Sequence, residues 1–294
     1  MRAAALGLIG VWLFWGINWP LWRASLQYTG PIEFMSLRAL FASALLVAAM
    51  FAMRRPLAPR PLLPLALIGL LQGVGMNGFS VIAVADSGAT KATIFAYTMP
   101  FWTVLFARLI LHEEIRPQHW TAIVLGMVGI GIVATAGGSS VSNVGALFAV
   151  CGGVCWALGT VVWKRTISQH EVDPMVMVTW QNIFSIVPLG IATWFLHEPP
   201  IEWAPLMTLA FAYNVLVTAG LSWFLWYYVV ERLPAATAGL SALAIPVVAI
   251  FTAFLFIGEH PTPSQWLGIA FMLAALAVVT YPASNQSAEP LAMK

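Results

Sequence analysis

The chain has 294 residues, of which 61% are hydrophobic and 8% are Asp, Glu, Lys or Arg. A soluble globular protein carries roughly a quarter charged residues, so this composition excludes that class and indicates a membrane protein. The formal net charge of +2 is too small to indicate a nucleic-acid surface, so no nucleic-acid partner is expected. Cys151 and Cys155 share one apolar run and predict no disulfide framework.

Ten apolar runs, each about twenty residues long, follow one another along the chain. Near-continuous runs of this length predict transmembrane α-helices rather than the alternating strands of a β-barrel. The expected spans are residues 3–22, 32–53, 61–85, 89–111, 117–137, 144–163, 174–196, 203–230, 235–257 and 262–281. The first run is not followed by a cleavage site and a polar domain, so we expect an uncleaved first helix. The polar tail, residues 283–294, is expected to be disordered.

Lysine and arginine fall mainly in alternate loops, which predicts the orientation because basic residues are retained on the cytoplasmic side. With the N-terminus inside, the cytoplasmic set is Arg2, Arg54, Arg55, Arg60, Arg108, Arg116, Lys164, Arg165, Arg232 and Lys294. The other side holds Arg23, Arg38 and Lys91. An even number of helices then returns the C-terminus to the cytoplasm.

The two halves of the chain repeat each other. An offset of 146 residues aligns five pairs without a gap around Pro100 and Pro246: Ala89 with Ala235, Ala92 with Ala238, Glu113 with Glu259, Pro117 with Pro263, and Trp120 with Trp266. An offset of 141 residues aligns Trp15 with Trp156 and Trp22-Arg23 with Trp163-Lys164. Because each half has an odd number of spans, the second copy enters the membrane from the opposite side. This predicts an inverted-topology repeat of residues 1–141 and 142–282, with a substrate site at the repeat interface.

These features resemble the EamA-type drug/metabolite transporter superfamily over nearly the whole chain. The resemblance rests on the five-plus-five plan, on Phe14-Trp15-Gly16, on Arg38 in the second helix, and on Pro100 with Glu113 mirrored by Pro246 with Glu259. The tryptophan-rich first helix is most similar to YddG-like exporters of aromatic and other amino acids. The resemblance implies amino-acid export across a bacterial inner membrane.

Charged groups are expected to avoid the middle of the spans. Every acidic residue and histidine falls at a predicted helix end, in a loop or in the tail, so proton-coupled antiport lacks its usual deep carboxylate. Arg38 and Arg108 are expected inside spans but near enough to the ends for their side chains to reach the interface. The resemblance implies a structural or gating role for Arg38, and Glu33 is a candidate ion-pair partner.

Uncharged amides are the polar groups expected within the spans: Asn18, Gln72, Asn77, Gln181, Asn182 and Asn214. They either join neighbouring helices or bind a zwitterionic or neutral ligand. Asn77 and Asn214 lie near the midpoints of their spans, where a repeat-interface site is expected, and are the preferred candidates.

Aromatic side chains complete the candidate site. Trp12, Trp15, Trp19 and Trp22 form one face of the first helix, with Asn18 at its edge, and Tyr97 and Trp102 flank Pro100. Such faces either pack in the core or line a ligand pocket. The expected substrate-binding set is Trp15, Asn18, Asn77, Tyr97, Trp102, Asn182 and Asn214.

Pro100 and Pro246 interrupt the helical hydrogen bonding of the fourth and ninth spans. Proline cannot donate to the carbonyl four residues earlier, which leaves the carbonyls of Ala96 and Ala242 without that bond. The prolines therefore predict either static kinks or bending elements beside a cavity. With Arg38 they form the expected hinge and gating set.

No enzyme motif is found. His112-Glu113-Glu114 lacks the second histidine of a zincin, and no phosphate-binding loop occurs, so no catalytic residue, metal or cofactor is expected. The favoured function is facilitative export of small metabolites, above all amino acids, by alternating access around a central cavity. The alternatives are export of nucleotide sugars or drugs, and a non-transporting scaffold. The lipid bilayer and the substrate are the expected partners, and the oligomeric state stays open, with a monomer compatible.

Overall fold

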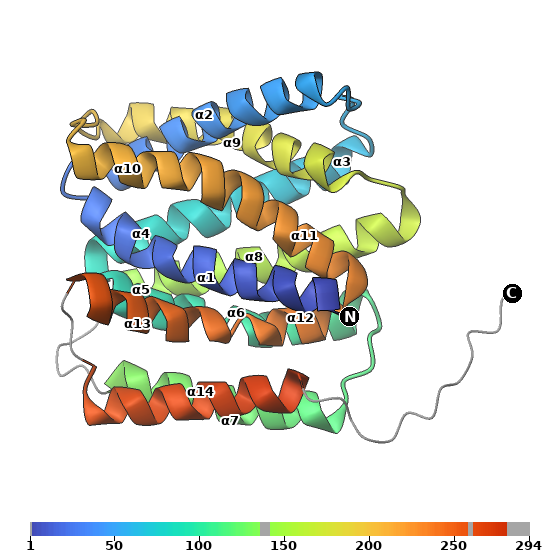
Figure 1. Ribbon diagram of the computed structural model, residues 1–294, viewed down its shortest axis with the longest axis vertical. Coiled ribbons are helices and arrows are strands. Elements are labelled where there is room, and N and C mark those ends of the chain that lie inside the picture. Colours follow the sequence, from blue (N-terminus) through green and yellow to red (C-terminus); the bar gives the residue numbers. More distant parts are fainter. Residues whose placement is uncertain (1, 136–141, 258–260, 281–294) are drawn as a thin grey trace, which may run out of the picture.

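The computed structural model describes residues 2–135, 142–257 and 261–280. Every regular element in these residues is a helix, and ten helical spans are long and apolar enough to cross a membrane. The prediction of an all-α protein with ten transmembrane helices is confirmed. In Figure 1 the spans lie side by side along the horizontal direction, with the loops at the two ends of the bundle.

Six spans are single helices and four are divided. The continuous spans are α1 (Arg2–Ser25), α2 (Pro31–Ala52), α7 (Pro117–Thr135), α8 (Asn143–Gln169), α9 (Pro174–Leu196) and α14 (Pro263–Thr280). The third span consists of α3 (Leu62–Ile68), the π-helix η1 (Gly69–Met76) and α4 (Asn77–Ser87), and the fourth of α5 (Ala89–Ala96) and α6 (Met99–Ile110). The eighth span consists of α10 (Pro205–Tyr213), η2 (Asn214–Ser222) and α11 (Trp223–Arg232), and the ninth of α12 (Ala235–Ser241) and α13 (Ala244–Ile257).

The divisions occur at equivalent places in the two halves. The offset of 146 residues that aligns Pro117 with Pro263 also aligns the start of α4 with the start of α11 and the end of η1 with the end of η2. In Figure 1, α7 and α14 lie side by side and run in opposite directions, as an inverted repeat requires. Residues 141 and 282, which end the two expected repeats, and the tail from 283 lie outside the described residues.

Small residues allow close approach of the helices. A Cβ atom on Gly129 of α7 would lie 2.7 Å from the carbonyl oxygen of Gly268 in α14. The outer face is apolar, and Trp120 and Trp194, near the ends of α7 and α9, are 59% and 78% exposed, as is typical of tryptophans that anchor a helix at the membrane interface. The buried amides Asn18, Gln72, Asn77 and Asn214 come from α1 and from the divided third and eighth spans, so both halves contribute polar groups to the core.

Candidate functional site

The tryptophan face of α1 lies in the centre of the bundle. Trp15, Trp19 and Trp22 are buried. Trp15 contacts Trp223 and Trp226 of α11, with ring centroids 5.0 and 5.7 Å away. Because α1 belongs to the first half and α11 to the second, these indoles form part of the repeat interface.

A small central cavity lies beside this face. It is lined by Trp15, Asn18, Trp19, Trp22, Met76, Asn77, Tyr97, Met99, Thr218 and Trp223. The structure thus brings together four members of the expected substrate-binding set: Trp15, Asn18, Asn77 and Tyr97. Its volume of about 20 Å³ is close to that of one water molecule. The centre is therefore closed to an amino acid in this conformation.

Two amides supply the polar part of the central cavity. The Asn77 side-chain nitrogen donates to the carbonyls of Gln72 and Gly73 at 2.7 and 3.3 Å, while its side-chain oxygen has no partner among the described residues. The Asn18 side-chain oxygen accepts from the Thr218 hydroxyl at 3.3 Å, and its nitrogen has no partner there. The lining therefore keeps one acceptor and one donor for a ligand.

The π-helices explain how Asn77 is held. In a π-helix, a backbone N–H donates to the carbonyl five residues earlier instead of four. Such segments recur at functional sites. At the end of η1, Asn77 bonds the carbonyl of Gln72, five residues earlier. At the end of η2, the Ser222 hydroxyl bonds the carbonyl of Val217 in the same way, at 2.8 Å. Sequence analysis did not predict these segments.

The other expected amides already have protein partners. The Asn214 oxygen accepts from the Trp22 indole nitrogen at 2.8 Å, and its nitrogen donates to the Ala210 carbonyl. The Asn182 nitrogen donates to the carbonyls of Val178 and Ala219, joining α9 to η2. Neither residue is part of the lining of the central cavity, although Asn214 positions Trp22 within it.

Trp102 also lies outside the central cavity lining. Its ring stacks on Phe106, one turn further along α6, with 6.4 Å between centroids. Its indole nitrogen is buried without a partner among the described residues. Tyr97, which precedes α6, points instead to Trp19, with 6.0 Å between their ring centroids. The two aromatics that flank Pro100 thus have different surroundings.

A buried hydrogen-bond network beside the central cavity was not predicted. The Tyr227 hydroxyl lies 2.7 Å from the Gln181 side-chain oxygen and 3.1 Å from that of Gln72. The Gln72 nitrogen donates to the Trp156 carbonyl and to Thr160. Four segments, η1, α8, α9 and α11, are joined through these side chains. The two glutamines were visible as buried amides, but nothing in the sequence paired them with Tyr227.

The expected proline kinks are complete helix breaks. α5 ends at Ala96 and α6 begins at Met99, so Pro100 occupies the first turn of a new helix, and Pro246 does the same in α13. The carbonyl of Ala242, expected to lack a bond, accepts from the backbone N–H of Ile245 at 2.9 Å. The expectation that this carbonyl lacks a hydrogen bond was therefore wrong, because the backbone at the break forms a turn in which the donor is three residues further along the chain.

Arg38 does not reach the membrane surface and does not pair with Glu33. Only 2% of Arg38 is exposed, and its Nε and Nη1 atoms have no partner among the described residues. Glu33 donates its backbone N–H to the carboxylate of Glu198 instead. The ion pairs among the described residues are Arg55 with Asp173 and Arg232 with Glu231. The expected reach to the interface and the expected ion pair with Glu33 were therefore wrong, and the structural or gating role of Arg38 stays a prediction.

The family comparison agrees with this architecture. The model of the EamA-like transporter family matches residues 2–135 and 143–281. The chain belongs to the EamA-like transporter family. It is therefore a multi-pass membrane transporter rather than an enzyme, and the resemblance to this superfamily is confirmed.

Several relatives match this EamA-like transporter over almost its full length. It is 29% identical to "Uncharacterized transporter YvbV" of Bacillus subtilis, covering 97% of this chain and 93% of the relative. It is 27% identical to "Uncharacterized inner membrane transporter YedA" of Escherichia coli K12, covering 93% and 89%. It is 24% identical to "Probable amino-acid metabolite efflux pump" of Salmonella typhimurium, covering 90% of each. A solved crystal structure, 21% identical, shares the fold with a TM-score of 0.79 over 95% of this chain and 98% of the other.

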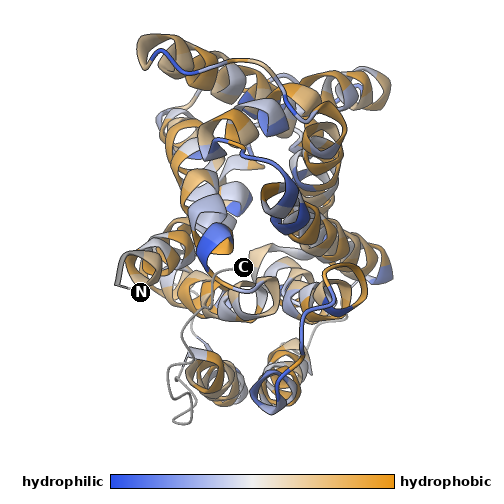
Figure 2. Ribbon diagram, turned by 90° about the vertical axis from the view of Figure 1, so that its right-hand side faces the viewer, coloured by the Kyte–Doolittle hydropathy of each residue, from blue (hydrophilic) through white to orange (hydrophobic). Residues whose placement is uncertain are grey.

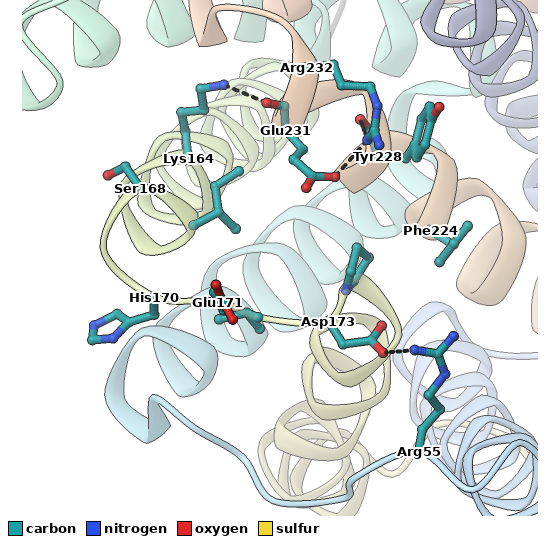
Figure 3. Close-up of a pocket in the computed structure, with 13 residues that line it drawn as sticks. Arg55, Lys164, Ser168, His170, Glu171, Asp173, Phe224, Tyr228, Glu231 and Arg232 are labelled. Atoms are coloured by element: carbon teal, nitrogen blue, oxygen red, sulfur yellow. Dashed lines mark hydrogen bonds and ion pairs between the residues drawn. The ribbon is translucent and has the colours of Figure 1, made fainter. Parts of the chain in front are cut away.

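A charged vestibule opens at the end of the EamA-like bundle that carries the N-terminus. Its volume is about 730 Å³, and it is lined by Arg55, Lys164, Ile167, Ser168, His170, Glu171, Val172, Asp173, Pro174, Phe224, Tyr228, Glu231 and Arg232 (Figure 3). Figure 2 looks onto this end, where hydrophilic segments border the middle of the bundle. Charges of both signs face the vestibule, so it is a polar, open pocket.

Two side chains stabilise helix ends near the charged vestibule. The Lys164 ammonium donates to the carbonyls of Val230 and Leu233 at 2.7 and 2.9 Å, at the C-terminal end of α11. The Glu113 carboxylate accepts from the N–H groups of Ala235 and Ala236 at the start of α12. Each charge complements the helix dipole that it faces. Glu259, the repeat partner of Glu113, lies outside the described residues.

Proposed function

We propose that this transporter exports small metabolites, above all amino acids including aromatic ones, by alternating access between its two halves. The observation that carries the proposal is the composition of the central cavity, which has aromatic walls, one unpartnered amide donor, one unpartnered amide acceptor and no charged lining residue. A zwitterion presents both an acceptor carboxylate and a donor ammonium, so it matches this lining. The efflux-pump relative supports the same substrate class.

Binding at such a site should be weak and tolerant of side-chain type. Neutral amides replace only part of the hydration that a zwitterion loses on entry. An aromatic substrate would add stacking on Trp15, Trp19 or Tyr97, worth about 0.5–1.5 kcal/mol per ring pair. Weak binding suits a carrier, because the substrate must leave again.

Transport requires the central cavity to enlarge, because the closed cavity holds about one water molecule. The two π-helices and the break between α5 and α6 contribute Met76, Thr218 and Tyr97 to the cavity lining. These segments and the break between α12 and α13 have fewer α-helical hydrogen bonds than the continuous spans. We infer that movement at these segments opens the cavity to alternate sides. Pro100 and Pro246 are the proposed hinge residues.

The proposed drive is the substrate gradient alone. Every acidic residue that the structure describes lies in a loop or within two turns of a helix end, so none is placed for proton transfer at the centre of the membrane. The basic residues around the charged vestibule support a cytoplasmic position for that end, and with it for the N-terminus. The relative named an inner membrane transporter supports the bacterial inner membrane as the location.

Other substrate classes fit the central cavity less well. Nucleotide sugars carry several negative charges on their phosphates, and the described residues place no cluster of basic side chains around the cavity to receive them. A cationic drug would need a carboxylate, which the lining also lacks. Membership in a transporter family disfavours the scaffold alternative.

The proposal is tested by flux into liposomes that contain the purified protein, with protein-free liposomes as the control. We expect Trp, Phe and Thr to equilibrate faster than in the control, with Trp favoured. An imposed pH gradient without a substrate gradient should produce no net accumulation. Absence of amino-acid flux would refute the substrate class, and accumulation driven by the pH gradient would refute the facilitative mechanism.

A further inference from the structure

Among the described residues, Arg38 is the lysine, arginine, aspartate or glutamate whose side chain is buried, and the function above does not use it. An arginine side chain does not lose its proton in proteins, so Arg38 is a cation that is 2% exposed. Neither Nε nor Nη1 has an acceptor among the described residues. Burying an unpaired charge is strongly unfavourable, so a buried charged group in a membrane protein indicates an oppositely charged partner.

Arg38 lies on α2, a helix that packs against the segment leading to the wall of the central cavity. Arg38 is the eighth residue of α2, about 10 Å along the helix from its start. Phe34 and Phe41, one turn before and after it, both contact the Phe211 ring of α10, at 5.8 and 5.5 Å between centroids. The face of α2 that carries Arg38 is therefore packed near the end of α10.

The end of α10 leads directly to the cavity lining. One turn beyond Phe211, Asn214 bonds the indole nitrogen of Trp22, which lines the central cavity. Arg38 itself is not part of that lining. The contacts of Phe211 and the bond from Trp22 to Asn214 connect the face of α2 that carries Arg38 to the cavity lining. A ligand in an enlarged cavity would reach the guanidinium only if Trp22 and Asn214 moved.

The second half of the chain has an unpartnered N–H donor at the helix position that is equivalent to Arg38. α2 and α9 both begin with proline, at Pro31 and Pro174, and their eighth residues are Arg38 and Gln181. Gln181 is 1% exposed; its oxygen accepts from Tyr227, and its nitrogen has no partner among the described residues. Both halves thus hold a buried N–H donor at this position, but only the first half adds a positive charge.

We propose that Arg38 binds an anion, namely the carboxylate of the transported amino acid. This inference rests on the proposed function and adds to it a charged subsite that selects amino acids over the corresponding amines. The planar guanidinium can donate two parallel hydrogen bonds to a carboxylate, which makes it a selective receptor for that group. A small inorganic anion such as chloride offers the same charge, so the experiment includes it as a separate ligand.

The test measures binding to the purified full-length protein in detergent, by the shift in unfolding temperature with each ligand. The ligands are tryptophan, indole-3-propionate, tryptamine and chloride, with a bulky sulfonate as the buffer anion. The variants are Arg38→Met and Arg38→Lys, with Arg108→Met as the matched control because Arg108 is exposed near a helix end. We expect Arg38→Met to weaken binding of the two carboxylates about tenfold or more, with tryptamine binding unchanged. Arg38→Lys should retain part of the affinity, and the control should match the wild type.

The unfolding temperature without ligand separates this role from a structural one. Removing an unpaired buried charge should leave the unfolding temperature equal or higher, whereas removing a structural contact should lower it. A lower unfolding temperature in Arg38→Met, with unchanged carboxylate binding, would overturn the proposal. A saturable shift with chloride and none with the carboxylates would also overturn it.

Flux distinguishes this proposal from the function on which it rests. Carboxylate binding that depends on Arg38, without any amino-acid flux in liposomes, would refute the proposed export and support the anion site. Amino-acid flux that is unchanged in Arg38→Met would support export and refute the site.

Discussion

Glycines make close contacts in two regions of the bundle: the divided spans at the centre, and the continuous pair α7 and α14 at the edge. The contacts have different consequences in the two regions. At the edge, Gly129 and Gly268 let two unbroken helices pack closely. At the centre, Gly153 of α8 lies against the break between α5 and α6, where a Cβ atom would be 2.6 Å from the carbonyl oxygen of Ala96. Close packing thus stabilises regular helices in one region and accommodates an irregular backbone in the other.

The difference indicates where movement is possible. α7 and α14 have continuous backbone hydrogen bonding, while the third, fourth, eighth and ninth spans contain π-helices or breaks. Irregular backbone within a membrane is tolerated where it is surrounded by protein or lines a cavity. We therefore expect the edge pair to support the fold, and the divided spans together with α1 to hold the proposed site. Substitutions in each region test this division.

The largest effect is expected from alanine at the break. Gly153→Ala should destabilise the protein by about 1–3 kcal/mol and abolish most transport, because the methyl group collides with the Ala96 carbonyl. Gly131→Ala is the matched control, since a Cβ atom on Gly131 in α7 meets nothing within 4 Å. Unfolding temperature and flux are measured for both. Equal behaviour of the two variants would show that the break accommodates the added methyl group.

The next effect concerns the network that joins the divided spans. Tyr227→Phe removes the hydroxyl that lies between Gln72 and Gln181 and leaves buried acceptors unpaired. We expect a loss of about 1–3 kcal/mol in unfolding free energy, measured by denaturant titration. Tyr228→Phe, on the next residue but facing the charged vestibule, should change it little. A wild-type value for Tyr227→Phe would show that water replaces the network.

A smaller effect should appear in substrate selectivity. Tyr97→Ala removes a ring from the central cavity lining and should lower the ratio of Trp to Thr flux about two- to tenfold. Trp102→Ala, whose ring stacks on Phe106 away from the lining, should leave the ratio unchanged, as should Trp120→Ala at the membrane edge. If Tyr97→Ala keeps the wild-type ratio, Tyr97 is a packing residue only.

The smallest effect on stability is expected at the breaks themselves. Pro100→Ala and Pro246→Ala replace first-turn prolines, which are compatible with helix starts, so the unfolding free energy should change by about 1 kcal/mol or less. Transport rates should nevertheless change, because alanine lets the helix extend across the break. Pro205→Ala, at the start of α10, serves as the control. Unchanged rates in both variants would exclude the prolines from the hinge.

Much of the fold follows from local sequence. Apolar runs long enough to cross the bilayer determined the ten spans, and the alignment of Pro100 with Pro246 located both breaks to within a few residues. Span length and proline position are local properties of the chain, so the sequence alone is sufficient to predict them. It also selected Asn18 and Asn77, because an amide in an apolar span needs a polar partner.

What only the tertiary structure decided is which of these groups are already paired. Asn214 was a preferred ligand residue, but its oxygen is taken by Trp22, 192 residues away in the chain. Trp102 and Tyr97 flank the same proline, yet only Tyr97 lines the central cavity. Arg38 is near enough to a helix end to reach the surface, yet packing buries it without an acceptor. Hydropathy depends on each residue alone, whereas pairing depends on distances between segments that only the folded chain brings together.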